Sequence, residues 1–217
     1  MSPLVKICGL STPETLDVAL DAGADAVGFV FFGPSPRNIS FEAARELSGR
    51  VKGRAQKAAL TVDADEELIA EIIETLKPDM LQLHGNESAD RVDAIRQTFG
   101  RPVMKVLPIA TRGDLARIER YAKVADRLLF DALPPRDATR PGGLGKPFDW
   151  HLLENLDLSI PFMLSGGLHV DNVAEALRIT RAPGVDVSSG VESAPGVKDP
   201  DKIRAFIRAA RSAKVPA

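Results

Sequence analysis

Two side chains of this chain could move protons if the fold brought them together. Cys8, the only cysteine, ends the apolar segment 4–8, and Asp131 ends the apolar segment 127–131. A thiolate can remove a proton, and a carboxyl group shielded from water can retain one and donate it as a general acid. Each residue also has an ordinary interpretation. A free cysteine is commonly a small buried apolar residue, and an aspartate often caps a helix or braces a loop.

Small residues follow the last two apolar segments, 161–164 and 185–187. They are Ser165, Gly166 and Gly167 after the first segment, and Ser188, Ser189 and Gly190 after the second. Glycine lets a backbone approach a phosphate closely and present its N–H groups. Two tight turns without a ligand are the alternative, but the repetition of the feature favours a phosphate site.

Two further positions could contact a substrate. Arg37 follows two prolines in the segment 32–38, and its guanidinium could hold a carboxylate through two parallel hydrogen bonds. A solvated surface arginine is the alternative. His84 follows the segment 80–83 and could bind substrate, or it could be an interior histidine with its hydrogen bonds satisfied.

The segment 132–147 is predicted to be a binding loop or a lid. It holds four prolines and three glycines, one of which is Gly143. Its sixteen residues exceed the roughly 2–6 of an ordinary strand-to-helix loop, and long loops of this kind are often functional. An insertion without a role is the alternative.

The elements that must position these residues alternate regularly. Most of the short apolar segments lack polar alternation, which is typical of parallel strands covered on both faces. Helical segments with start and stop signals separate them. The start signals are Thr12-Pro13 before the first helix, Ser40 before the second, Asp65 before the third and Asp199-Pro200 before the last, and Asp149 is expected to cap a short helix that runs through Leu153. We expect eight strands, at 4–8, 26–31, 57–62, 80–83, 103–106, 127–131, 161–164 and 185–187, and eight helices.

This order predicts an α/β fold, a (β/α)8 TIM barrel that forms one domain over residues 1–217. An open, doubly wound parallel sheet is the competing architecture. In a barrel the active site lies at the carboxyl ends of the strands, where the residues above are placed.

Composition narrows the classes of protein. The chain has 28 basic and 30 acidic residues, a formal net charge of -2, which disfavours a nucleic-acid binder. No Cys/His cluster has zinc spacing, so we expect no metal. The longest apolar stretch, 26–32, is far short of the roughly 20 residues that span a bilayer, and no signal peptide is evident. We therefore expect a cytoplasmic protein that binds neither membranes nor nucleic acids.

The ordered set of motifs resembles the phosphoribosylanthranilate isomerase family of tryptophan biosynthesis. The resemblance extends from residue 5 to about residue 207. It rests on Val5-Lys6-Ile7-Cys8-Gly9, Gly23 to Phe31 with Ser35-Pro36-Arg37, Leu81-Gln82-Leu83-His84-Gly85, Phe130-Asp131 with Gly142 to Gly145 and Phe148-Asp149-Trp150, Ser165-Gly166-Gly167-Leu168, and Gly184 to Glu192 with Pro195-Gly196 and Lys198-Asp199.

The resemblance implies a barrel isomerase that acts on a phosphorylated small molecule without a cofactor. The reaction is the Amadori rearrangement of N-(5'-phosphoribosyl)anthranilate. It implies that Asp131 is the general acid, that Cys8 is the general base and that Arg37 holds the anthranilate carboxylate. The phosphate would be held by residues 165–167 and 188–190, and the remaining substrate contacts would come from Gln82, His84, Gly143 and Gly145.

Other members of the barrel class remain as alternatives. The related isomerase of histidine biosynthesis has an Asp at the position of Cys8. Indoleglycerol phosphate synthase relies on Lys and Glu at strand ends, and no matching Glu is evident here. A barrel that binds phosphate without catalysing a reaction would not need the acid or the base. Both Asp131 and Cys8 are present, which favours an enzyme. Either a monomer or a homodimer is compatible with the sequence.

Overall fold

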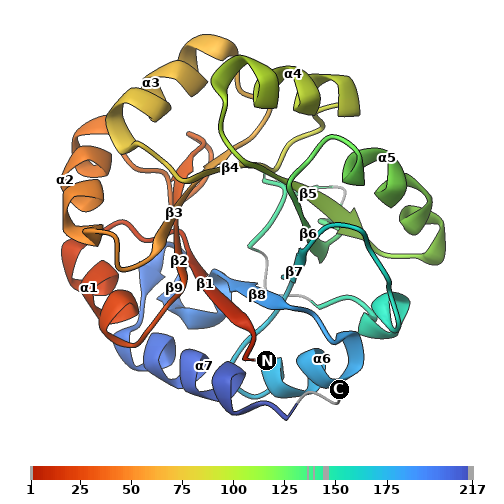
Figure 1. The fold of residues 1–217 in the computed structure, drawn as a ribbon. Coiled ribbons are helices and arrows are strands. Elements are labelled where there is room, and N and C mark those ends of the chain that lie inside the picture. The colour runs from red at the N-terminus through yellow and green to blue at the C-terminus, as the bar shows by residue number, and fades with distance from the viewer. Residues whose placement is uncertain (1, 136, 139, 144–146, 215–217) are drawn as a thin grey trace.

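Eight parallel strands form a closed barrel in the order of the chain (Figure 1). The computed structural model describes residues 2–135, 137–138, 140–143 and 147–214. The strands are β1 (Leu4–Cys8), β2 (Ala26–Phe31), β3 (Gln56–Thr61), β4 (Met80–Leu83), β5 (Val103–Ile109), β6 (Arg127–Ala132), β7 (Phe162–Leu164) and β8 (Gly184–Val187). Because β1 pairs with both β2 and β8, the barrel prediction is confirmed and the open sheet is excluded.

The strands are buried on both faces, as their apolar sequences predict. All six residues of β2 are buried. Side chains two positions apart in a strand face the same side, so every second residue points into the barrel. A cluster apart from the main core consists of Met80, Met104, Val106, Leu129 and Met163, contributed by four neighbouring strands. The larger core lies between the strands and the surrounding helices.

Seven α-helices occur within the described part of the chain and surround the barrel. They are α1 (Pro13–Asp21), α2 (Phe41–Val51), α3 (Glu66–Leu76), α4 (Ala89–Phe99), α5 (Ile118–Ala122), α6 (Val173–Thr180) and α7 (Pro200–Ser212). The predicted start signals act as N-caps. The Ser40 hydroxyl accepts from the Ala43 N–H at 3.1 Å, and the Asp65 carboxylate accepts from the Leu68 N–H at 2.9 Å.

The prediction of eight helices is wrong at one position. Among the described residues between β6 and β7, the helical element is a 3₁₀ turn, η2 (Trp150–Leu153), where Asp149 was expected to cap a helix. Asp149 does accept a hydrogen bond from the His151 N–H, but the turn ends after four residues. A second 3₁₀ turn, η1 (Arg112–Arg117), precedes α5.

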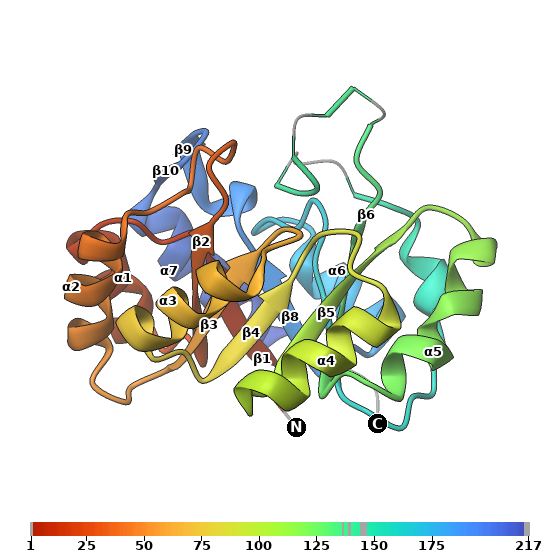
Figure 2. The same ribbon diagram turned by 90° about the horizontal axis from the view of Figure 1, so that it is seen from above.

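An additional hairpin follows β8. A short 3₁₀ turn, η3 (Ser189–Val191), leads into β9 (Glu192–Ala194), which pairs antiparallel with β10 (Val197–Lys198) before α7 begins. Figure 2 shows this hairpin at the same end of the barrel as the segment that follows β6, opposite the end where the N and C labels lie. None of the helices in the described ranges is long and apolar enough to cross a membrane.

Candidate active site

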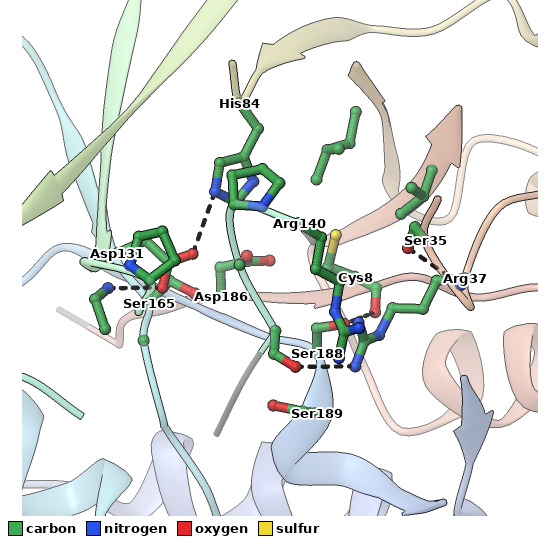
Figure 3. Close-up of a pocket in the computed structure, with 18 of the residues that line it drawn as sticks. Cys8, Ser35, Arg37, His84, Asp131, Arg140, Ser165, Asp186, Ser188 and Ser189 are labelled. Carbon is green, nitrogen blue, oxygen red and sulfur yellow. Dashed lines mark hydrogen bonds and ion pairs between the residues drawn. The ribbon is translucent and has the colours of Figure 1, made fainter. Parts of the chain in front are cut away.

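A pocket opens at the carboxyl ends of the strands and collects most of the predicted site residues (Figure 3). Cys8 and ten other predicted site residues line this pocket. The ten are Arg37, Gln82, His84, Asp131, Gly143, Ser165, Gly166, Gly167, Ser188 and Ser189. Gly190 is not among the lining residues, and Gly145 lies outside the described residues. The barrel therefore brings these residues together from six of its strand ends or the loops that follow them, those of β1, β2, β4, β6, β7 and β8.

Cys8 is buried in an apolar layer at the end of β1. Its neighbours in this layer are Val30 and Leu60, from β2 and β3. Burial raises the pKa of the thiol above its ordinary value, because a thiolate loses hydration there, and the positive charge of Lys6 opposes this effect. The Cys8 carbonyl accepts a hydrogen bond from the Ser188 hydroxyl at 3.1 Å, which joins β1 to the loop after β8.

Asp131 reaches the same pocket from β6, across the barrel from β1. One carboxylate oxygen, Oδ1, accepts from the Ala132 N–H at 2.8 Å. The other, Oδ2, lies 3.3 Å from His84 Nε2. Figure 3 shows Asp131 and Cys8 on two sides of the pocket, with Asp186 between them in that view. This placement suits a molecule that needs an acid and a base at different atoms.

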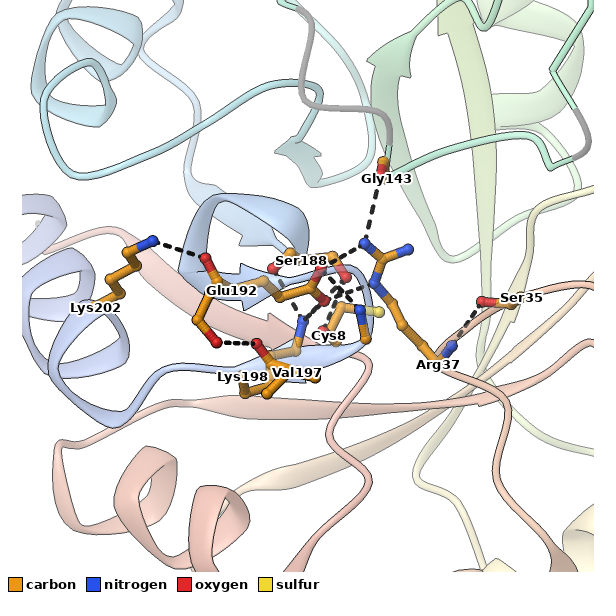
Figure 4. Close-up of polar contacts among 11 residues, drawn as sticks. Cys8, Ser35, Arg37, Gly143, Ser188, Glu192, Val197, Lys198 and Lys202 are labelled. Atoms are coloured by element: carbon orange, nitrogen blue, oxygen red, sulfur yellow. Dashed lines mark hydrogen bonds and ion pairs between the residues drawn. The ribbon is translucent and has the colours of Figure 1, made fainter.

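Arg37 is held by a carboxylate of the protein itself (Figure 4). Its Nε and Nη2 donate to Glu192 Oε1 and Oε2 at 2.7 and 2.8 Å, and both side chains are buried. Nη2 also donates to the Gly143 carbonyl at 3.4 Å. The guanidinium group predicted to bind a substrate carboxylate thus already binds Glu192 through Nε and Nη2. Nη1 is the guanidinium nitrogen that has no bond to Glu192.

Glu192 also binds Lys198, which supports the loop after β8. Lys198 Nζ donates to Glu192 Oε1 at 2.7 Å and to the Ser188 carbonyl at 2.9 Å. Burial raises the pKa of Glu192, but the hydrogen bonds from Arg37 and the charge of Lys198 outweigh it, so this pKa lies below its ordinary value. One buried carboxylate therefore joins the Arg37 loop to the predicted phosphate loop.

The two predicted phosphate loops lie against each other. Gly166 and Gly167 have φ angles of 85° and 65°, a region that favours glycine, and these angles form the turn after β7. A Cβ on Gly190 would lie 1.8 Å from the Leu168 carbonyl oxygen, so the loop after β8 packs directly on the loop after β7. Gly190 therefore has a packing position behind the pocket.

Gln82 presents an unpaired acceptor at the pocket. It lies in β4 and is almost fully buried, and its Oε1 has no hydrogen-bond partner among the described residues. A buried acceptor without a partner is costly, so a donor on a bound molecule would satisfy it. This supports the prediction that Gln82 contacts substrate.

Several charged residues at the site were not among the predicted ones: Lys6, Arg140, Asp186, Glu192 and Lys198. Lys6 and Asp186 interrupt otherwise apolar strands two positions before Cys8 and Ser188. A charged residue at a strand position whose side chain points into the barrel is unusual, and this signal in the sequence could have identified Lys6 and Asp186 as site residues. Nothing local to Glu192 or Lys198 in the sequence pairs them with Arg37. No group of three His, Cys, Asp or Glu residues with metal-site geometry occurs in the ranges that the structure describes.

The closed barrel, with a thiol, a carboxylate and two glycine loops at the carboxyl ends of its strands, places the chain in the class of (β/α)8-barrel enzymes. A family model for N-(5'-phosphoribosyl)anthranilate (PRA) isomerase matches residues 5–209. The chain belongs to this isomerase family.

Relatives and solved structures agree with this assignment. The N-(5'-phosphoribosyl)anthranilate isomerase of Bradyrhizobium diazoefficiens is 69% identical over 212 residues, which cover 98% of this chain and 95% of that protein. The crystal structure of the Thermotoga maritima isomerase is 35% identical, with a TM-score of 0.86 and coverage of 96% of this chain and 98% of that one. Another solved isomerase, at 33% identity and a TM-score of 0.82, is a complex with reduced 1-(o-carboxyphenylamino)-1-deoxyribulose 5-phosphate; the match covers 96% of this chain and 98% of that one.

Proposed function

We propose that the chain converts N-(5'-phosphoribosyl)anthranilate to 1-(2-carboxyphenylamino)-1-deoxy-D-ribulose 5-phosphate, with Asp131 as general acid and Cys8 as general base. The observation that carries the assignment of roles is that these two side chains, 123 positions apart in the sequence, line one pocket. The solved relative that binds a reduced aminodeoxyribulose phosphate supports the substrate class.

The first step opens the sugar ring. As the bond between C1 and the ring oxygen breaks, the Asp131 carboxyl group gives its proton to that oxygen, and the lone pair of the substrate nitrogen forms a C1=N bond. The product is a protonated Schiff base. A positioned acid of this kind contributes roughly 10²- to 10⁴-fold to a rate.

The second step moves a proton from C2. The positive Schiff-base nitrogen attracts electrons and acidifies that proton, and its charge also favours a thiolate nearby. Cys8 removes the proton, the C2–H electron pair forms a C1=C2 bond, and the C=N pair returns to nitrogen. The enolamine then becomes the ketone: C1 takes the proton from Cys8, and the C2 hydroxyl gives its proton to Asp131, so both groups return to their starting states.

The remaining pocket residues bind the two anionic ends of the substrate. Arg37, through Nη1, holds the anthranilate carboxylate, while Gln82 and His84 contact the central part of the molecule. Residues 165–167 and the loop 188–190 hold the phosphate through backbone N–H groups. In this proposal the chain acts as one barrel domain, as a monomer or a homodimer.

The test follows the disappearance of phosphoribosylanthranilate fluorescence with the native chain, Cys8→Ala and Asp131→Asn. We expect turnover by the native chain and a loss of roughly 10²-fold or more in each variant, with unchanged circular dichroism. The histidine-pathway substrate is assayed in parallel. Near-normal turnover by either variant would refute the role of that residue, and preference for the second substrate would favour the alternative isomerase.

A further inference from the structure

A buried lysine lies directly below the proposed base. Lys6 and Cys8 are two positions apart in β1, so both point into the barrel. Lys6 is only 1% exposed, which is rare for a lysine unless it is paired. Its Nζ lies 2.7 Å from Asp186 Oδ1 on β8, whose backbone is in register with Lys6.

The neighbouring strand leaves room for the ammonium to approach the sulfur. Gly28 of β2 is in register with Cys8. A Cβ on Gly28 would lie 2.8 Å from Cys8 Sγ and 3.1 Å from Lys6 Nζ. The two side chains therefore share the space that the missing side chain leaves open.

We propose that Lys6 is a positioning residue of the reaction: its buried ammonium, anchored by Asp186, stabilises the Cys8 thiolate that removes the substrate proton. This inference rests on the proposed role of Cys8 as the base. Creating a thiolate in an apolar layer is costly, and an adjacent opposite charge recovers part of that cost.

Lys6 is suited to this role because it remains an ammonium. Burial alone would lower its pKa, but the charges of Asp186 and Cys8 outweigh burial, and the pKa is raised above its ordinary value. The charged groups that act on Cys8 come from three strands: Lys6 of β1, Asp186 of β8 and Lys198 of β10. The β2 residues in contact, Gly28 and Val30, carry no charge. Among the charges, that of Lys6 has the largest effect on Cys8, and it favours the thiolate.

The test uses the fact that Cys8 is the only cysteine, so a single alkylation by iodoacetamide reports on it alone. The rate is measured against pH by mass spectrometry in the native chain and in Lys6→Met. We expect Lys6→Met to move the midpoint of the profile to higher pH and to slow alkylation near pH 7 by about tenfold or more. At high pH the thiol is fully ionised, so the limiting alkylation rate there measures access of the reagent to the sulfur. The midpoint of the profile measures ionisation.

The matched control is Lys105→Met. Lys105 is also almost fully buried in the barrel, and it forms an equivalent 2.7 Å ion pair, with Glu87. It acts away from Cys8, so its loss leaves the midpoint of the alkylation profile unchanged. A midpoint that moves equally in both variants would indicate a general effect of losing a buried ion pair and would overturn the proposal.

A second variant covers the case in which Lys6→Met does not fold because Asp186 is left unpaired. Lys6→Met combined with Asp186→Asn removes both charges, and the midpoint still moves upward, by less than in the single variant. An unchanged or lower midpoint in a folded variant overturns the proposal. Alkylation does not depend on turnover, so a catalytically competent Cys8→Ala would refute the proposed function while leaving this coupling measurable.

Discussion

At the scale of residues, the role of Cys8 depends on one chemical property. The thiol lies among apolar groups, so burial favours its neutral form, and a nearby positive charge is needed to make proton removal accessible. A hydroxyl at the same position has similar size but ionises far less readily. The sulfur, and not the shape of the side chain, should therefore determine the rate.

Cys8→Ser is the corresponding prediction. We expect kcat to fall by roughly 10²-fold or more, because the general base is lost while the pocket keeps its shape. The Kd of reduced 1-(o-carboxyphenylamino)-1-deoxyribulose 5-phosphate, measured by calorimetry, should remain within about twofold of the native value. Binding of this analogue requires no proton transfer, so it does not depend on the general base. A serine variant with native kcat would contradict the role of the thiolate.

Also at this scale, Arg37 takes its conformation from a residue far away in the sequence. Glu192, 155 positions later, holds its Nε and Nη2. Removing one member of a buried charge cluster lowers the free energy of unfolding by more than the ion pair itself contributes to it. The reason is that the remaining charges are left buried without a partner. Glu192 therefore matters for stability as well as for the orientation of Arg37.

We predict that Glu192→Gln lowers the free energy of unfolding near pH 7 by about 3–5 kcal/mol. The native pKa of Glu192 lies below its ordinary value of 4.5, so its carboxylate stabilises the folded state above that pH, and this contribution is lost as pH falls through the native pKa. The difference between the native chain and the variant should therefore narrow on acidification. Urea unfolding at several pH values measures it, with the exposed Glu74→Gln as the control. A difference that widened at low pH would contradict this account.

At the scale of elements, the two glycine loops form one structure. The loop after β8 packs on the loop after β7 at the contact between Gly190 and the Leu168 carbonyl. Any side chain at Gly190 must push the loops apart, because both atoms of the Leu168 carbonyl group lie within 2.9 Å of the added Cβ. The proposed phosphate site would then lose its geometry without losing any group that contacts the phosphate.

Gly190→Ala should reduce kcat/KM by roughly ten- to a hundredfold, as expected when binding groups shift by about an ångström. Inhibition by inorganic phosphate should weaken in parallel. The control is Gly49→Ala, on the exposed face of α2, where an added Cβ meets nothing within 4 Å. That substitution should leave kinetics unchanged and raise stability by about 0.5–1 kcal/mol. Native phosphate inhibition in Gly190→Ala would argue against these loops as the phosphate site.

At the scale of the whole molecule, the local field of the pocket differs from the net charge. The chain carries a formal charge of -2, but its pocket is lined by two arginines, Arg37 and Arg140, as well as by Asp131 and Asp186, and Lys198 contacts the loop that lines it. Charges near a site act locally, while distant surface charges are screened by salt. A weakly acidic protein can therefore bind a substrate with two anionic ends.

The closure of the barrel also belongs to this scale. The last helix, α7, packs near the seam between the first and last strands, and its Phe206 is completely buried. We predict that Phe206→Ala lowers the free energy of unfolding by about 3–5 kcal/mol. The exposed Arg208→Ala, two positions along the same helix, should change it by less than about 0.5 kcal/mol. Equal stability of the two variants in urea would show that α7 does not support the barrel.

The sequence by itself determined the alternation of elements and the edge of the barrel that carries the site. Apolar strands, N-caps such as Ser40 and Asp65, and polar or small residues after the strands are local features, so they can be recognised from neighbours in the chain. The helix expected between Asp149 and Leu153 is a 3₁₀ turn in the structure, because these few residues are too short a stretch for more than one helical turn.

Only the tertiary structure decided which charges act together. The contacts of Lys6 with Cys8 and Asp186, and of Arg37 with Glu192, depend on the register of β1 against its two neighbouring strands and on the hairpin after β8. Such partners are distant in the sequence, and each buried charge selects its counterpart by proximity in a medium of low dielectric constant. No local pattern encodes that choice, because it is made when the barrel closes.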